Sequence, residues 1–219
     1  MKKLFFIFAV LFFSVQGFAQ VQQGQQMINF RGDLGFQLHN TGINYSTYGS
    51  RVDWGSLGAE AGLAYYYFLT PHWGLGADIS IGDFDGANIT FSTHNIVNDQ
   101  THLYNVMLAG RYNLNPSSRG RIFIPFGAGL TAARQSLHID YYGAKFDNKR
   151  TNLSPGLYIG AGLEFDIGDN GWGFGLESRY NTFWYATDKL VKNAPAPIHE
   201  TGKRCYQYVS LILNIYKRF

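Results

Sequence analysis

The last nine residues, LILNIYKRF (residues 211–219), alternate between apolar and polar side chains up to the final phenylalanine. Alternation with a period of two predicts a β-strand with one apolar face, and Asn214 falls on the opposite, polar face. The apolar parity holds Val209, Leu211, Leu213, Ile215 and Phe219. Because chain ends that are not tied down are poorly ordered, we expect this strand to pair with another.

The same alternation recurs in seven earlier segments, so the whole chain reads as a series of strands. These segments are residues 27–39, 57–69, 73–82, 102–113, 121–133, 153–167 and 172–181, of which 121–133 alternates least clearly. Short links follow the second, fourth and sixth segments, and links of roughly 15 to 20 residues follow the others. The stretch ANITFSTHN (residues 87–95) is expected to prolong one hairpin. This asymmetry of links is typical of up-and-down membrane barrels.

Residues 1–19 are typical of a secretory signal peptide. Two lysines precede an apolar core from Leu4 to Val15, and small residues near the end predict cleavage after Ala19. We therefore expect a signal peptide over residues 1–19 and one barrel domain over residues 20–219. No later apolar run reaches the length of a membrane helix, so a membrane would be crossed with strands.

The composition limits the function classes. Beyond residue 19 the chain has 16 basic and 15 acidic side chains, so it lacks the excess of positive charge that is typical of proteins that bind nucleic acid. The single cysteine, Cys205, excludes an intramolecular disulfide framework. Clustered metal-ligand spacing is absent, and we expect neither a metal nor another cofactor. The 26 glycines and 17% aromatic residues instead favour many strands joined by turns.

Charged residues within the segments fall on the parity opposite the apolar face. A soluble barrel would turn the apolar face inward, whereas a membrane barrel turns it toward lipid. The long apolar stretches, the aromatic residues beside the short links and the glycines on the charged parity favour the membrane barrel. Charges buried together must pair, so we expect an interior charge network of Arg31, Asp33, Glu60, Asp78, Arg111, Glu164, Glu177 and Arg179. The expected periplasmic aromatic girdle is Trp73, Tyr112, Phe165, Trp172 and Phe219.

The fold prediction follows from these patterns. Lipid offers no hydrogen-bond partners, so an open sheet edge is excluded and the last strand must pair with the first. The sequence predicts an all-β fold, namely an eight-stranded antiparallel up-and-down transmembrane β-barrel. Short periplasmic turns lie at one end of this barrel, and four long extracellular loops lie at the other.

The segments FGAGL (residues 126–130) and IGAGLEF (residues 159–165), together with the terminal aromatic residue, resemble a known family. It comprises the small eight-stranded outer-membrane barrels of Gram-negative bacteria, the OmpX-like and OmpA-like domains of porin-family proteins. The GFAQ motif at residues 17–20 is similar to signal ends of the Bacteroidetes group. The resemblance implies location in the cell outer membrane. It also implies that the barrel-assembly machinery reads Phe219, Ile215 and Leu213, although Lys217 departs from the usual pattern.

Three function classes follow. An eight-stranded interior has room only for side chains, which favours a structural or surface-interaction role, through loop display or adhesion, with a plugged polar interior. Six inward carboxylates, counting Asp166, against three arginines, together with inward glycines that leave room for water, suggest a narrow gated or cation-preferring pore as an alternative. A lipid-modifying enzyme is a third alternative. We expect no enzyme, because no serine or aspartate recurs at a fixed spacing from the loop histidines His94, His102, His138 and His199.

The expected partners are outer-membrane lipid, lipopolysaccharide and an extracellular ligand that the sequence does not identify. Basic residues of the last loop are candidates for contact with lipopolysaccharide phosphates. They are Lys189, Lys192, Lys203 and Arg204. We expect a monomer.

Overall fold

The computed structural model describes residues 20–38, 43–45, 57–85, 89–92, 95–141, 144–186, 198–200 and 203–219. The expected signal peptide over residues 1–19 lies outside the described residues. All regular elements within the described ranges are β-strands. In these ranges no helix is long and apolar enough to cross a membrane.

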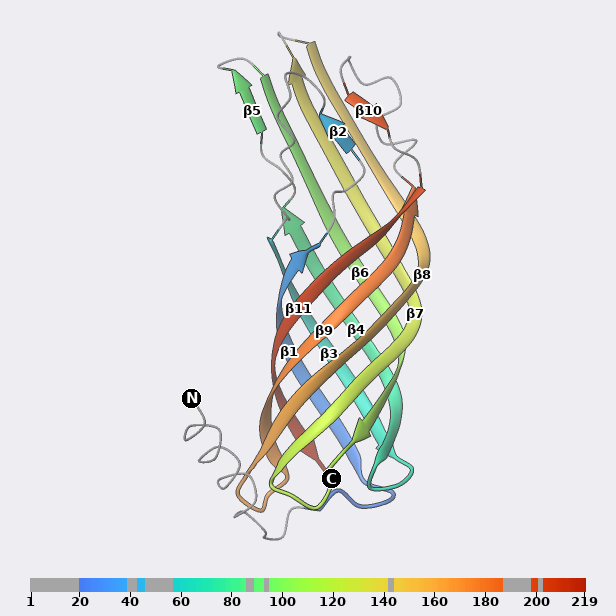
Figure 1. Cartoon of the computed structure of the whole chain (residues 1–219), viewed down its shortest axis with the longest axis vertical. Coiled ribbons are helices and arrows are strands. Elements are labelled where there is room, and N and C mark those ends of the chain that lie inside the picture. The colour runs from blue at the N-terminus through green and yellow to red at the C-terminus, as the bar shows by residue number, and fades with distance from the viewer. Residues whose placement is uncertain are drawn as a thin grey trace, which may run out of the picture.

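Eight long strands form one closed antiparallel barrel (Figure 1). They are β1 (Gln26–Gln37), β3 (Leu57–Phe68), β4 (Trp73–Asp85), β6 (Asn95–Asn113), β7 (Gly120–Tyr141), β8 (Ala144–Ile167), β9 (Trp172–Ala186) and β11 (Lys203–Arg218). Each strand pairs with the next one in this order, and β11 pairs with β1. The predicted eight-stranded up-and-down barrel is therefore confirmed.

The closing strand explains why the apolar pattern runs to the last residue. β11 pairs with β9 from Lys203 to Lys217 on one side and with β1 from Tyr208 to Arg218 on the other. The final residue joins this ladder, because the Phe219 amide donates to the Gln26 carbonyl at 3.1 Å and the Gln26 amide donates back at 2.9 Å. Every residue of LILNIYKRF thus belongs to the seam that seals the barrel.

The barrel is apolar outside and polar inside. Leu108 and Leu153 on the outer surface are 77% and 69% exposed, whereas Arg111, Arg121 and Arg179 are among the largest fully buried side chains. Water would favour the reverse arrangement, because buried charges are costly and exposed leucines gain nothing. The distribution therefore fits a barrel surrounded by hydrocarbon.

The two ends of the barrel differ. Tight turns at residues 69–72, 114–119 and 168–171 form one end, called the short-turn end below, and both described chain termini lie there (Figure 1). At the other end β6, β7 and β8, with 19, 22 and 24 residues, project beyond the remaining barrel strands of 12 to 16 residues (Figure 1).

The projecting strands replace part of the expected loops. β7 and β8 pair as far as Tyr141 and Ala144, so the expected long link after residue 133 is mostly a hairpin. The pattern of a lipid-facing strand stops at residue 133, because beyond it the outward side chains, such as Arg134, are polar, whereas the apolar Leu137 and Ile139 face inward and are buried. β5 (Ile89–Ser92) pairs with β6, which confirms the predicted extension over the part of residues 87–95 that the structure describes. β2 (Ile43–Tyr45) pairs with β10 (Ile198–Glu200), which joins the first and last loops.

Candidate functional site

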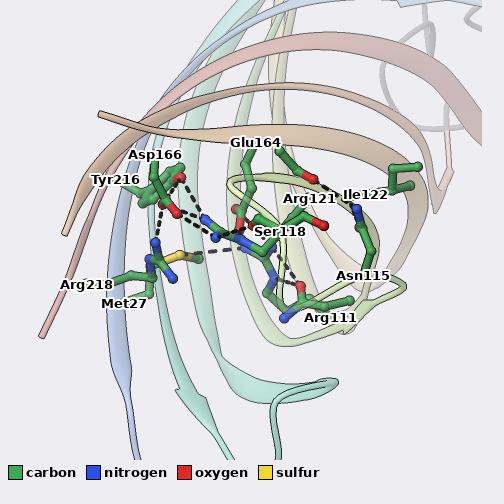
Figure 2. Close-up of polar contacts among 12 residues, drawn as sticks. Met27, Arg111, Asn115, Ser118, Arg121, Ile122, Glu164, Asp166, Tyr216 and Arg218 are labelled. Atoms are coloured by element: carbon green, nitrogen blue, oxygen red, sulfur yellow. Dashed lines mark hydrogen bonds and ion pairs between the residues drawn. The ribbon is translucent and has the colours of Figure 1, made fainter. Parts of the chain in front are cut away.

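The barrel interior near the short-turn end is a layer of ion pairs centred on Arg121 of β7. Figure 2 shows its guanidinium group between two carboxylates of β8. Arg121 Nε donates to Glu164 Oε1 at 2.6 Å, and its two terminal nitrogens donate to the Asp166 oxygens at 2.7 and 2.6 Å. Arg111 of β6 approaches the other Glu164 oxygen at 2.9 Å. Such charge-assisted, two-point contacts are among the strongest hydrogen bonds in proteins.

The closing strand β11 joins this layer through Asp166. The Tyr216 hydroxyl donates to Asp166 Oδ1 at 2.8 Å and accepts from Arg121 at 2.9 Å. Arg218 also pairs with Asp166. The Arg111 guanidinium lies 4.0 Å from the centre of the Phe123 ring, a cation–π contact. Strands β6, β7, β8 and β11 are therefore connected across the lumen.

A second layer lies near the middle of the barrel and is centred on Asp78 of β4. Arg31 of β1 lies 3.1 Å from Asp78 Oδ1, and Arg179 of β9 lies 2.6 Å from Asp78 Oδ2. Arg31 also contacts Asp33 at 3.5 Å, and Arg179 also pairs with Glu177. Arg179 of β9 thus reaches Asp78 from the opposite wall of the barrel, and this contact crosses the lumen.

Glu60 of β3 extends this layer through neutral side chains. Ser80 Oγ donates to Glu60 Oε2 at 3.2 Å, and the Asn105 amide donates to Ser80 Oγ at 3.0 Å. Thr131 Oγ1 then donates to Asn105 Oδ1 at 2.7 Å. This hydrogen-bonded row crosses four consecutive strands, β3, β4, β6 and β7.

All eight residues of the expected interior network are buried in the barrel, and the two layers contain all of them. Two arginines that sequence reasoning left out, Arg121 and Arg218, lie there as well. The interior therefore holds five arginines against six carboxylates instead of three against six. Arg121 was missed because its segment alternates least clearly. Arg218 shares the parity of Asn214, a signal that was available.

Inward glycines do not leave room for water, and that expectation is wrong. A Cβ atom at Gly162 would lie 2.3 Å from the Phe123 ring, and one at Gly127 would lie 2.3 Å from the Tyr158 ring. The glycines thus accommodate large side chains of neighbouring strands. The cavity beside Glu60 has a volume of only about 10 Å³, close to the minimum for a single water molecule.

Two buried apolar clusters adjoin the polar layers. Toward the projecting strands lie Phe84, Leu103, Ala133, Phe183, Tyr206 and Tyr208. The other cluster reaches from the level of Asp78 to the short-turn end and comprises Val21, Met27, Ala64, Tyr66, Phe68, Ala109 and Tyr216. Val21 reaches this position because its amide donates to the Pro116 carbonyl at 3.1 Å, across the mouth of the barrel.

The aromatic residues expected as a girdle lie on the outer surface of the short-turn end. The Trp73 and Tyr112 rings are 4.8 Å apart, and Phe165 stacks on Phe174 at 5.4 Å. Trp172 and Phe219 are exposed, and the Lys217 ammonium lies 5.4 Å from the Trp172 ring. The outward side chains Leu213 and Ile215 continue the apolar parity toward Phe219.

Two histidines pair with aspartates on the outer face of the projecting region. His102 Nδ1 lies 3.2 Å from Asp83 Oδ1, and His138 Nδ1 lies 2.6 Å from Asp147 Oδ1. Spacing along the sequence did not reveal these pairs, because each joins residues on adjacent strands. The side chains of His94 and His199 lie outside the described residues. No group of three or more His, Cys, Asp or Glu residues that could hold a metal ion occurs in the described part of the chain.

Known proteins share this architecture. Residues 5–194 match the family described as outer membrane protein beta-barrel domain. OprG of Pseudomonas aeruginosa is 10% identical with a TM-score of 0.53, over 93% of this chain and 99% of that chain. The outer membrane protease OmpT of Escherichia coli is 8% identical with a TM-score of 0.50, over 94% and 100%. Neisserial surface protein A is 10% identical with a TM-score of 0.49, over 90% and 100%. A search of curated proteins found no match.

Proposed function

Because the chain belongs to the outer membrane β-barrel family, we propose that this integral outer-membrane protein serves surface interaction and does not conduct solutes. In such barrels the short turns are periplasmic and the opposite end is extracellular. The projecting part of β6, β7 and β8 is therefore the part that meets the cell exterior. We further propose that residues 1–19 direct export and that residues 20–219 form the mature barrel.

The projecting hairpin of β7 and β8 carries this proposal. β8 pairs with β9 only from Gly156 onward, yet it pairs with β7 back to Ala144. At about 3.3 Å per residue, this stretch of strand extends well past the lipid-facing belt. Its outward side chains change from Leu153 to polar residues, which fits a surface in water. A paired sheet also holds its surface in one shape, which lowers the entropy lost when a partner binds.

The interior supports the same proposal. Two ion-pair layers and two apolar clusters occupy the described part of the lumen, where a solute would pass. The cavity beside Glu60 has a volume of only about 10 Å³. The alternative of a cation-preferring pore rested on inward glycines that leave room for water, and both the filled space beside Gly162 and the near balance of arginines and carboxylates weaken it. The interior thus acts as a plug that holds the barrel together.

Shortening the hairpin tests the proposed surface role. Residues 137–148 are replaced by the two-residue turn Asn-Gly, which connects directly paired strands. We expect cells producing this variant to lose most of their attachment to glass and to one another, while heat-modifiable mobility on gels still reports a folded barrel. Asp169→Asn, in a periplasmic turn, is the control and should attach like the wild type. Equal attachment by the shortened variant would refute the proposal.

We expect no modification of outer-membrane lipid by this protein. In the described part of the chain neither His102 nor His138 is hydrogen-bonded to a serine hydroxyl, so no activated serine is assembled there. Mass spectrometry of lipid A from cells with and without the protein should give identical spectra. A product that disappears when both histidines are changed to alanine would overturn this expectation.

A further inference from the structure

The outer face of the hairpin of β7 and β8 is positively charged where it leaves the membrane. Arg134 and Lys149 are both exposed on this face. In the part of the chain that the structure describes, neither has a carboxylate within 4.0 Å, whereas all five interior arginines do. Two unpaired cations on one face indicate a surface that attracts an anion.

The positive charge is confined to the lower half of the hairpin. Arg134 is directly opposite Thr151, and Ser136 is directly opposite Lys149, so two hydroxyl groups lie between the two cations. Nearer the tip, His138 pairs with Asp147, and Asp140 is opposite Lys145. The tip is therefore balanced, and the excess charge lies next to the lipid-facing belt.

An apolar groove lies below these cations on the same outer face. It spans β4 to β9, has a volume of about 580 Å³ and is lined almost wholly by apolar side chains. Its floor includes Ala128, which lies between Leu108 of β6 and Leu157 of β8 in the strand register. On β7, only Leu130 and Ala132 separate Ala128 from Arg134 on this face.

We propose that this surface binds one anionic, phosphate-bearing lipid of the outer leaflet. The phosphate lies between Arg134 and Lys149, where a guanidinium group offers two parallel hydrogen bonds and the hydroxyls of Ser136 and Thr151 offer more. One acyl chain then runs down the strand face into the groove over Ala128. Charge above and apolar surface below match the two ends of such a lipid. The inference does not depend on the proposed surface role, because the shortened hairpin keeps Arg134 and Lys149.

Native mass spectrometry of the full mature barrel in detergent tests this site. The probes are dioleoyl phosphatidylglycerol and dioleoyl phosphatidylcholine, which differ only in headgroup. We expect the wild type to prefer the anionic lipid. The double variant Arg134→Gln, Lys149→Gln should lose about 5-fold in affinity for each cation removed, with little change for the zwitterionic lipid. Lys145→Gln, opposite Asp140, is the matched control and should keep the preference.

A second pair of variants tests the groove. Ala128→Phe should weaken binding of both lipids, whereas Ala161→Phe should not, because Ala161 lines a different outer groove beside Leu34 and Leu213. Heat-modifiable mobility confirms that each variant folds, and Arg134→Lys with Lys149→Arg should retain most of the binding.

Several results would overturn the proposal. One is an unchanged preference in the double glutamine variant, and another is an equal loss with Lys145→Gln. A third is complete displacement of the lipid by free glycerol 3-phosphate at the same concentration as the lipid, which would indicate that the site binds the headgroup alone and not the acyl chain. A dimer that Ala128→Phe abolishes would identify a second copy of the chain as the occupant.

Discussion

Arg121 is the residue at which the interior of the barrel is most densely connected. It contacts two carboxylates of β8 and the Tyr216 hydroxyl of the closing strand. Removing one partner of a buried ion pair is strongly destabilising, because the remaining charges stay buried. We expect Arg121→Met to lower the free energy of unfolding by about 3 kcal/mol, measured by urea denaturation in detergent micelles. Arg134→Met, on the same strand but exposed, should change it by less than about 0.5 kcal/mol. A similar small effect at Arg121 would contradict the structural role of the layer.

Gly58 and Gly32 allow a matched comparison between an inward and an outward glycine. A Cβ atom at Gly58 would lie 2.4 Å from the Phe84 ring inside the barrel. Gly32 faces outward, and a Cβ atom there would have no neighbouring atom within 4 Å. Overpacking of a filled interior costs about 1–3 kcal/mol, so Gly58→Ala should destabilise the barrel by that amount. Gly32→Ala should be neutral or slightly stabilising, because alanine restricts the unfolded chain. Equal urea midpoints for the two variants would show that the interior has unused space.

Among the elements, the closing strand makes the sharpest prediction. The backbone of Phe219 pairs with Gln26, while its side chain is 57% exposed on the outer surface. Phe219→Ala keeps the backbone hydrogen bonds and removes only the ring. We expect it to refold into lipid vesicles in vitro like the wild type, yet to reach the folded, heat-modifiable form in cells several-fold less efficiently. An equal loss in both assays would mean that the ring stabilises the barrel and is not a signal for assembly.

The strands also show what the sequence could and could not predict. Alternation located all eight barrel strands and the inward side of Glu60 and Asp78, because lipid outside and a filled lumen inside impose opposite polarity on the two faces. It did not reveal the hairpin beyond residue 133, since that hairpin has water on its outer face. Contacts such as Arg31 with Asp78 join strands that are not adjacent, so they depend on how the barrel closes and not on spacing in the chain.

At the scale of the whole molecule, the filled interior predicts the electrical behaviour. Asp78 bridges arginines from β1 and β9, the Arg121 layer crosses the lumen below it, and a cavity beside Glu60 has a volume of only about 10 Å³. A hydrated ion would have to break several charge-assisted hydrogen bonds in both layers to pass. We therefore expect no sustained conductance steps when the purified barrel is inserted into planar bilayers in about 1 M KCl, a salt concentration that screens exposed charges but reaches buried pairs poorly. A general porin in the same chamber is the positive control, and protease protection confirms insertion of the barrel. Reproducible unitary steps that shift in size with Asp78→Asn would show that the layers open, and the barrel would then be a gated pore.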